Sequence, residues 1–86
     1  MLKASEANRI ANGWYEEAEN RTMDYLERLI LARAKDGLKW FPWDYEFSME
    51  ENGLTAKGKQ NIIFKLRSAG YDVKDNRIMK EIIIRW

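Results

Sequence analysis

The sequence predicts an α+β domain in which a long N-terminal helix and a second, shorter helix accompany a small, three-stranded, mostly antiparallel sheet, in the order α-β-α-β-β. Three observations lead to this prediction. Apolar residues recur every three or four positions over residues 5–35, which is the period of a helix. The same period returns over residues 55–69. Alternating apolar residues over 38–47, 71–74 and 77–86 predict three strands.

The first helix is predicted to begin with Ser5 as its N-cap and to end before Gly37, the residue type that favours the position past a helix end. At ~1.5 Å per residue this helix would be about 45 Å long. A compact domain of this size has a radius of gyration of only ~12 Å. Either the helix breaks near Gly13 and folds back, or its first turns protrude, with Trp14 and Tyr15, and pack on a partner or on a second copy.

Residues 38–47, LKWFPWDYEF, are half aromatic. Alternation along a strand places the odd-numbered aromatic residues on one face, which we expect to be core: Phe41, Trp43, Tyr45 and Phe47. Trp40 is left on the opposite face beside Pro42. Because proline has no N–H for a β-ladder, this strand is predicted either to lie at the edge of the sheet or to bulge at Pro42.

Ser48 begins a sequence with the spacing of a capping box, but Asn52 and Gly53 follow at once, so we expect a short turn or a single helical turn before the second helix. Gly70 is predicted to end that helix. The last strand has one apolar face: Ile78, Ile82, Ile84 and Trp86. Its other face carries Met79 and Ile83.

The composition is that of one globular domain, residues 1–86, divided into the long helix (1–36) and a β-α-β-β unit (37–86). Apolar residues make up 45% of the chain and charged residues 34%, and there is neither Cys nor His. Disulfides are excluded, and the commonest general base and metal ligand are absent. We therefore predict a protein that is not an enzyme and has no cofactor, metal or small-molecule substrate. The short apolar runs predict no membrane helix and no signal peptide.

Two patterns that suggest chemistry are interpreted as structural. The acidic residues fall into three groups: Glu16, Glu17 and Glu19; Asp44 and Glu46; Glu50 and Glu51. We interpret the first group as a solvated helix face and the second as acids that guard an edge strand against aggregation. The string G-x-x-x-x-G-K is present at 53–59, but Gln60 replaces the Ser or Thr of a phosphate loop, and no apolar strand leads into it.

Charge divides the chain into two halves. Residues 1–53 carry a net charge of −4 and residues 54–86 carry +5, which together give the total of +1. A helix followed by a basic hairpin is how winged helices meet DNA. The candidate nucleic-acid contacts are basic side chains of this half: Lys57, Lys59, Lys65, Arg67 and Arg77. Two observations count against this hypothesis. The preceding elements as predicted do not form the helical bundle that such domains need, and Asp72, Asp75 and Glu81 interrupt the basic patch.

Protein binding is the leading hypothesis. If both helices cover one face of the sheet, the other face presents an apolar patch that is surrounded by charged residues. The patch consists of Leu38, Trp40, Met79 and Ile83. The alternative is that the two helices cover both faces. The candidate contacts are the surplus aromatic and apolar residues: Trp14, Tyr15, Trp40, Trp43, Met79 and Ile83.

Three short motifs carry a resemblance to a known group of proteins. Residues 66–73 read L-x-x-x-G-Y-x-V, residues 83–86 read I-I-x-W, and residues 3–8 read KASEAN. Together they resemble small α-β-α-β-β proteins of unassigned function that are encoded by tailed phages and prophages. The resemblance implies a location in the bacterial host cytoplasm.

Small phage proteins of mixed charge are similar in kind to inhibitors of host enzymes or host defence systems, including anti-CRISPR proteins. The sequence therefore predicts a phage-type binding protein that occludes a surface of a bacterial host protein. A nucleic-acid-binding regulator is one alternative. A structural virion component or homo-oligomer, with self-association through the long helix, is the other.

Overall fold

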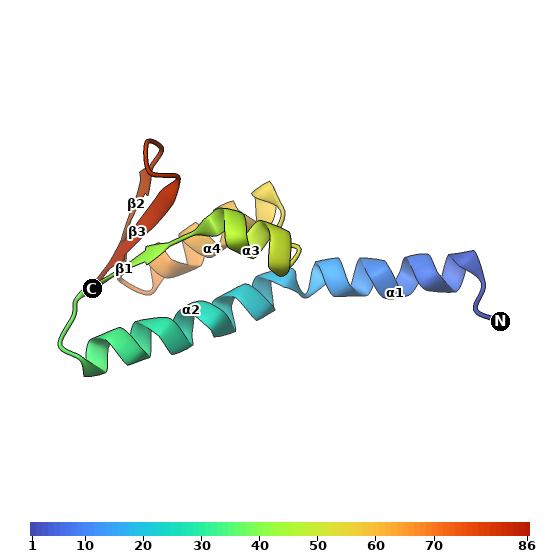
Figure 1. Cartoon of the computed structure of the whole chain (residues 1–86), viewed down its shortest axis with the longest axis horizontal. Coiled ribbons are helices and arrows are strands. Elements are labelled where there is room, and N and C mark those ends of the chain that lie inside the picture. Colours follow the sequence, from blue (N-terminus) through green and yellow to red (C-terminus); the bar gives the residue numbers. More distant parts are fainter.

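The computed structural model describes residues 1–86 and confirms the α+β prediction (Figure 1). Seven elements follow one another along the chain: α1 (Ala4–Glu16), α2 (Ala18–Lys35), β1 (Trp40–Trp43), α3 (Tyr45–Glu51), α4 (Ala56–Ser68), β2 (Asp72–Asn76) and β3 (Glu81–Arg85). The molecule measures 52 × 28 × 21 Å, because α1 extends away from a body formed by the other elements.

The sheet is antiparallel throughout, with the strand order β1-β3-β2. β1 lies at an edge, one of the two alternatives that Pro42 predicted. The central strand β3 aligns Ile84 with Phe41 on one side and with Val73 on the other. Paired residues in an antiparallel ladder point to the same face, so these three side chains lie on one face together.

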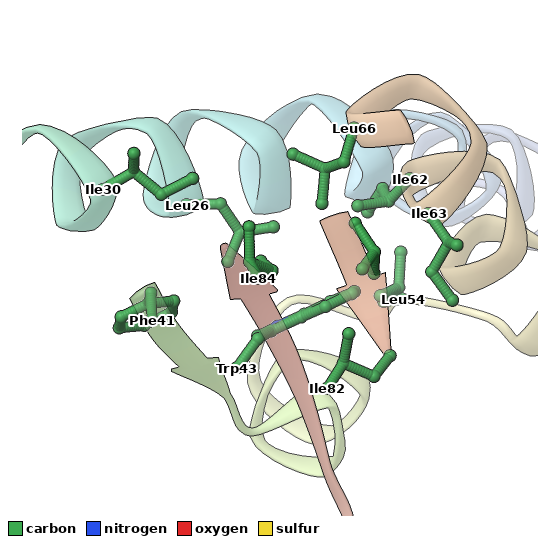
Figure 2. Close-up of a cluster of buried hydrophobic side chains, with 11 residues drawn as sticks. Leu26, Ile30, Phe41, Trp43, Leu54, Ile62, Ile63, Leu66, Ile82 and Ile84 are labelled. Atoms are coloured by element: carbon green, nitrogen blue, oxygen red, sulfur yellow. The ribbon is translucent and has the colours of Figure 1, made fainter. Parts of the chain in front are cut away.

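Both α2 and α4 cover this same face of the sheet (Figure 2). The core is one cluster of buried side chains from the two helices, the three strands and the turn before α4: Leu26, Ile30, Phe41, Trp43, Leu54, Ile62, Ile63, Leu66, Val73, Ile82 and Ile84. The opposite face of the sheet has no helix over it. Of the two arrangements that the sequence left open, the one-sided arrangement is therefore correct.

The predicted long helix is two helices. It breaks at Glu17, four residues after Gly13, and the chain does not fold back there but continues into α2 (Figure 1). At the break the guanidinium of Arg21 donates a hydrogen bond to the main-chain carbonyl of Trp14. A side-chain donor that inserts beside the helical ladder is a recognised cause of a kink. No residue of α1 is buried, so its first turns do protrude.

The predicted strand 38–47 is wrong in its second half. β1 ends at Trp43, and the carboxylate of Asp44 accepts a hydrogen bond from the main-chain N–H of Phe47 at 3.2 Å, which caps α3. Tyr45 is half-buried and Phe47 is 46% exposed, so only Phe41 and Trp43 of the four aromatic residues are buried. A residue with a good N-cap side chain directly after Trp43 favours a helix over a continued strand.

The predicted capping box is also wrong, because Ser48 lies inside α3 and is fully buried. Its hydroxyl oxygen accepts a hydrogen bond of 2.9 Å from the indole Nε1–H of Trp43. The serine satisfies the one polar atom of a buried tryptophan, which ties α3 to β1. The final strand is shorter than predicted, since β3 begins at Glu81 and both Ile78 and Met79 lie in the turn before it.

Candidate binding surfaces

The helices α3 and α4 form a helix-turn-helix unit. Four residues join them, Asn52 to Thr55, and Gly53 in this turn has a φ of +69°. A short connection that contains glycine is typical of this motif. Leu54 is buried in the core, and the hydroxyl of Thr55 accepts a hydrogen bond from the N–H of Gly58 at 3.0 Å, which caps α4. The turn is therefore fixed at both of its ends.

An antiparallel hairpin follows this unit directly. With α2 and β1 before it, the order from α2 to β3 is helix, strand, helix, helix and hairpin, and β1 completes the sheet beside β3. A winged helix has this order of elements, with α4 as the second helix of the helix-turn-helix unit and β2-β3 as the wing. One of the two objections raised by the sequence, that no helical bundle precedes the basic helix, no longer holds, because α3 is a helix and α2 packs against α4.

The predicted basic contacts divide into two groups. Lys59, Lys65 and Arg67 are held within the chain. Lys59 forms an ion pair of 3.7 Å with Asp75, and its ammonium lies 3.7 Å from the centre of the Tyr45 ring. Lys65 pairs with Glu19 at 3.4 Å.

Arg67 donates a hydrogen bond of 2.8 Å to the carbonyl oxygen of Val73. Lys57 and Arg77 are exposed and belong to none of the ion pairs. Of the five basic candidates, these two are the ones whose charge is not engaged inside the molecule.

The exposed face of α4 carries Lys57, Gln60 and Phe64, which follow one another at helical spacing. The Phe64 side chain is 72% exposed. At the tip of the wing, Ile78 is 93% exposed and Met79 is 63% exposed. Both the helix and the wing thus present apolar as well as polar groups to solvent.

The uncovered face of the sheet is the second candidate surface. Its register places Trp40 beside Arg85 and Pro42 beside Ile83, and a groove of 370 Å³ lies among Trp40, Ile83, Arg85 and Lys39. The predicted apolar patch is smaller than expected. Met79 is in the turn and not on the strand, and Leu38 lies before β1.

The base of α1 is the third candidate surface. The Trp14 ring packs over Gly53, where an added Cβ would lie 2.2 Å from a ring carbon. The guanidinium of Arg21 lies 4.2 Å from the centre of that ring and also donates to the carbonyl oxygen of Asn52 at 3.0 Å. Tyr15 meets Trp14 edge to face, with 5.1 Å between ring centres. Trp14 therefore anchors α1 to the helix-turn-helix turn and still exposes 43% of its surface.

The six predicted protein contacts do not gather into one site. Trp14 and Tyr15 lie at the base of α1, Trp40 and Ile83 on the uncovered sheet face, and Met79 at the wing tip. Trp43 is fully buried, so it is excluded as a contact and belongs to the core. Its inward position follows from the same alternation that put Phe41 in the core.

One groove has no counterpart among the surfaces predicted from the sequence. It has a volume of 490 Å³ and lies between the C-terminal half of α2 and the segment that follows α4. Six of its eight lining residues are hydrophobic, among them Leu31, Tyr71 and Trp86. The 55% exposure of Leu31 is the signal of this groove, but in the sequence Leu31 is one apolar residue of a helical pattern like the others.

Three of the acidic residues that suggested chemistry, Glu19, Asp44 and Glu46, make contacts within the fold. Asp44 caps α3, and Glu46, which lies on this helix and not on a strand, pairs with Lys80 of the wing at 3.9 Å. Glu19 accepts a hydrogen bond of 2.8 Å from the amide of Asn61. Within the G-x-x-x-x-G-K string, Gly58 lies inside α4. No group of three or more carboxylates is placed to hold a metal ion.

When the chain is compared with protein-family models, with curated proteins and with solved structures, none of the three comparisons finds a match. None of the helices is both long and apolar enough to span a bilayer.

Proposed function

We propose that this chain is a nucleic-acid-binding regulator that contacts DNA with α4 and with the β2-β3 wing. The observation that supports the proposal is the helix-turn-helix unit followed by an antiparallel hairpin. Of these elements, α4 and the hairpin lie within residues 54–86, the part of the chain that carries the net charge of +5. The order of the elements alone does not assign a function to a chain. The exposed side chains of α4 add chemical groups that can bind DNA.

The exposed residues of α4 provide the kinds of group that read base edges. In helix-turn-helix proteins the N-terminal part of the second helix meets the bases. Lys57 and Gln60 lie there. A glutamine amide matches the major-groove edge of adenine, and Phe64 offers an apolar contact for a thymine methyl group. Arg77 on the wing is placed to contact a phosphate, which fixes register without reading sequence.

Acidic side chains restrict the expected footprint. Glu46, Glu50 and Glu51 all lie on α3, which in many helix-turn-helix proteins crosses the DNA backbone. Carboxylates repel phosphates, so α3 would stand away from the duplex and leave the contact to α4 and the wing. A small footprint with few phosphate contacts means weak non-specific binding with a shallow dependence on salt.

Fluorescence anisotropy with a labelled DNA duplex, at salt concentrations from 50 to 200 mM, tests this proposal. Lys57→Gln and Arg77→Gln are each expected to lower the slope of log K against log salt by about 0.9. Lys35→Gln is the matched control, because it removes the same charge from α2 and is expected to leave the slope unchanged. The proposal fails if the wild-type chain binds no duplex at the lowest salt, or if the control lowers the slope as much.

A second candidate function is occlusion of a bacterial host protein. The observation that favours it is the uncovered sheet face, where Trp40 lies on the edge strand β1 and Ile83 lies on the adjacent strand β3. Exposed aromatic anchors with a charged rim are typical of protein interfaces. The resemblance to small phage proteins adds the bacterial host cytoplasm as the setting in which such an inhibitor would act.

The test is affinity capture from nuclease-treated bacterial lysate in high salt. A stoichiometric partner that Trp40→Ala loses and Phe47→Ala retains would support this function. Phe47 is a suitable control because it is a similarly exposed aromatic residue on α3. Retention by both variants would exclude the sheet face as the contact.

A further inference from the structure

Apart from the contacts of Trp14 near its C-terminal end, the helix α1 lacks within its own chain the packing that ordinarily stabilises a helix. It has 13 residues, none of them buried, and its N-cap Lys3 makes no side-chain capping bond. Isolated helices of this length are marginal in water, and most helices in proteins are stabilised by the packing of an apolar face. Ile10, in the middle of α1, is 64% exposed. A contact outside the chain would supply the missing burial.

The sequence of α1 has the spacing of a helix that pairs with another helix. Its small and aromatic residues recur at alternating intervals of three and four, as at the a and d positions of a coiled coil: Ala4, Ala7, Ala11 and Trp14. Lys3, Ile10 and Glu17 follow one another every seventh residue along one flank of this face. The flank thus begins with a positive charge, has an apolar centre and ends with a negative charge.

We propose that α1 pairs with α1 of a second copy in antiparallel orientation. With Ala7 opposite the partner's Ala11, Ala4 lies level with the partner's Trp14. The small side chain of Ala4 leaves room for the part of Trp14 that its contacts with Gly53 and Arg21 leave exposed. Two-fold symmetry produces each of these contacts twice.

The same register brings the flanks together. Ile10 meets the partner's Ile10, and Lys3 lies beside the partner's Glu17 at both ends of the pair. Opposite charges at flanking positions of paired helices set partner choice and orientation.

Charge favours the antiparallel over the parallel alternative. In a parallel pair the flank of Lys3, Ile10 and Glu17 would lie beside the other flank of the partner helix, which carries Asn8 and Tyr15, so neither Lys3 nor Glu17 would meet an opposite charge. The wider distribution agrees with the antiparallel choice. Over residues 3–9, Lys3 and Arg9 outnumber Glu6, whereas Glu16, Glu17 and Glu19 lie at and around the break that follows α1.

The length of α1 determines how strong the proposed dimer is expected to be. At ~1.5 Å per residue α1 is about 20 Å long. A pair of helices this short buries less than the roughly 1,200–2,000 Å² of a standard stable interface. The dimer should therefore be weak and dependent on concentration. It would carry two copies of α4, the form in which helix-turn-helix proteins read paired half-sites, but the self-pairing itself does not rest on nucleic-acid binding.

Sedimentation equilibrium over a range of protein concentrations, without nucleic acid, tests the proposal. Lys3→Glu and Glu17→Lys alone each reverse one partner of both ion pairs and should weaken dimerisation about tenfold. The double variant restores both pairs with the signs exchanged and should return to within about twofold of the wild type. Lys35→Glu makes the same charge change on α2 and should have no effect.

Three outcomes would overturn the inference. The wild-type chain could sediment as a monomer at every concentration. The double variant could dimerise no better than the single variants, which would mean that the two charges do not meet. The control could weaken the dimer as much as Lys3→Glu, which would show a response to net charge alone. Because the assay contains no DNA, each of these outcomes leaves the nucleic-acid proposal standing.

Discussion

The helices α1 and α2 are neighbours in the chain and carry the same apolar period, yet the structure uses them differently. α2 buries Ala18, Thr22, Leu26 and Ile30, one residue in each successive turn. α1 buries none. The difference is one of position, because α2 runs along the sheet and α1 extends past its end (Figure 1). Apolar periodicity therefore shows that a helix has a face to cover, but it does not show whether the same chain covers it.

The largest loss of stability should come from truncating an isoleucine in the core between the helices and the sheet. Ile62 on α4 is fully buried in the core cluster. Ile62→Ala leaves a cavity under the sheet and should lower the free energy of unfolding by about 2–5 kcal/mol. Urea denaturation followed by circular dichroism measures this change. A loss below about 1 kcal/mol would mean that α4 is not packed as described.

A smaller but definite loss is expected from the buried hydrogen bond between β1 and α3. Ser48→Ala leaves the indole Nε1–H of Trp43 buried without an acceptor, which should cost about 1–3 kcal/mol of the free energy of unfolding. Ser68→Ala, at an exposed serine of α4, is the control and should stay within about 0.5 kcal/mol. Equal effects of the two substitutions, again by urea denaturation, would contradict the role of Ser48.

The helices that carry Ile62 and Ser48 show which parts of the fold could be predicted from the sequence. The helical face of α4, the edge position of β1 and the inward direction of Phe41 followed from local periodicity and from Pro42. The helix α3 did not, because alternating aromatic residues continue through Asp44 and match a strand. The competing signal was present, since an aspartate at that position is a good helix N-cap.

The candidate surfaces were harder to predict than the fold. The basic residues were correctly placed on α4 and the wing, but the sequence could not show that Lys59 is held by Asp75 or Lys65 by Glu19, since each pair joins distant segments. For the same reason the docking of Trp14 on Gly53 was not foreseen. Such contacts depend on tertiary geometry, which no local pattern encodes.

The contact that holds α1 against the rest of the molecule can be disrupted by one substitution at Gly53. Gly53→Ala places a Cβ 2.2 Å from the Trp14 ring and forces alanine into a positive φ, which costs about 1–2 kcal/mol. We expect Trp14 to leave the turn and hydrogen exchange in α1 to accelerate. Gly13→Ala is the matched control. Its Cβ meets nothing within 4 Å, and alanine favours the helix by up to ~1 kcal/mol, so exchange in α1 should slow. Slower exchange in both variants would show that Trp14 does not anchor α1.

The smallest effect on the stability of the monomer should come from Ile10→Ala. This is the same substitution as Ile62→Ala, but it is made in α1 and not in the core. Ile10 is exposed, so its truncation removes no core contact and should change the free energy of unfolding by less than about 0.5 kcal/mol in dilute solution. Alanine also has the higher helix propensity, which offsets any small loss.

At concentrations where the dimer forms, the same substitution should weaken self-association, because Ile10 meets its own symmetry mate in the proposed pair. Urea denaturation in dilute solution and sedimentation equilibrium on the same sample separate the two effects. A loss above about 1 kcal/mol in the dilute monomer would mean that α1 packs on its own body, and the contrast between the two helices would then be wrong. If Ile10→Ala weakens only the dimer, the apolar face of α1 is covered by a second copy of the chain, as the apolar face of α2 is covered by the sheet.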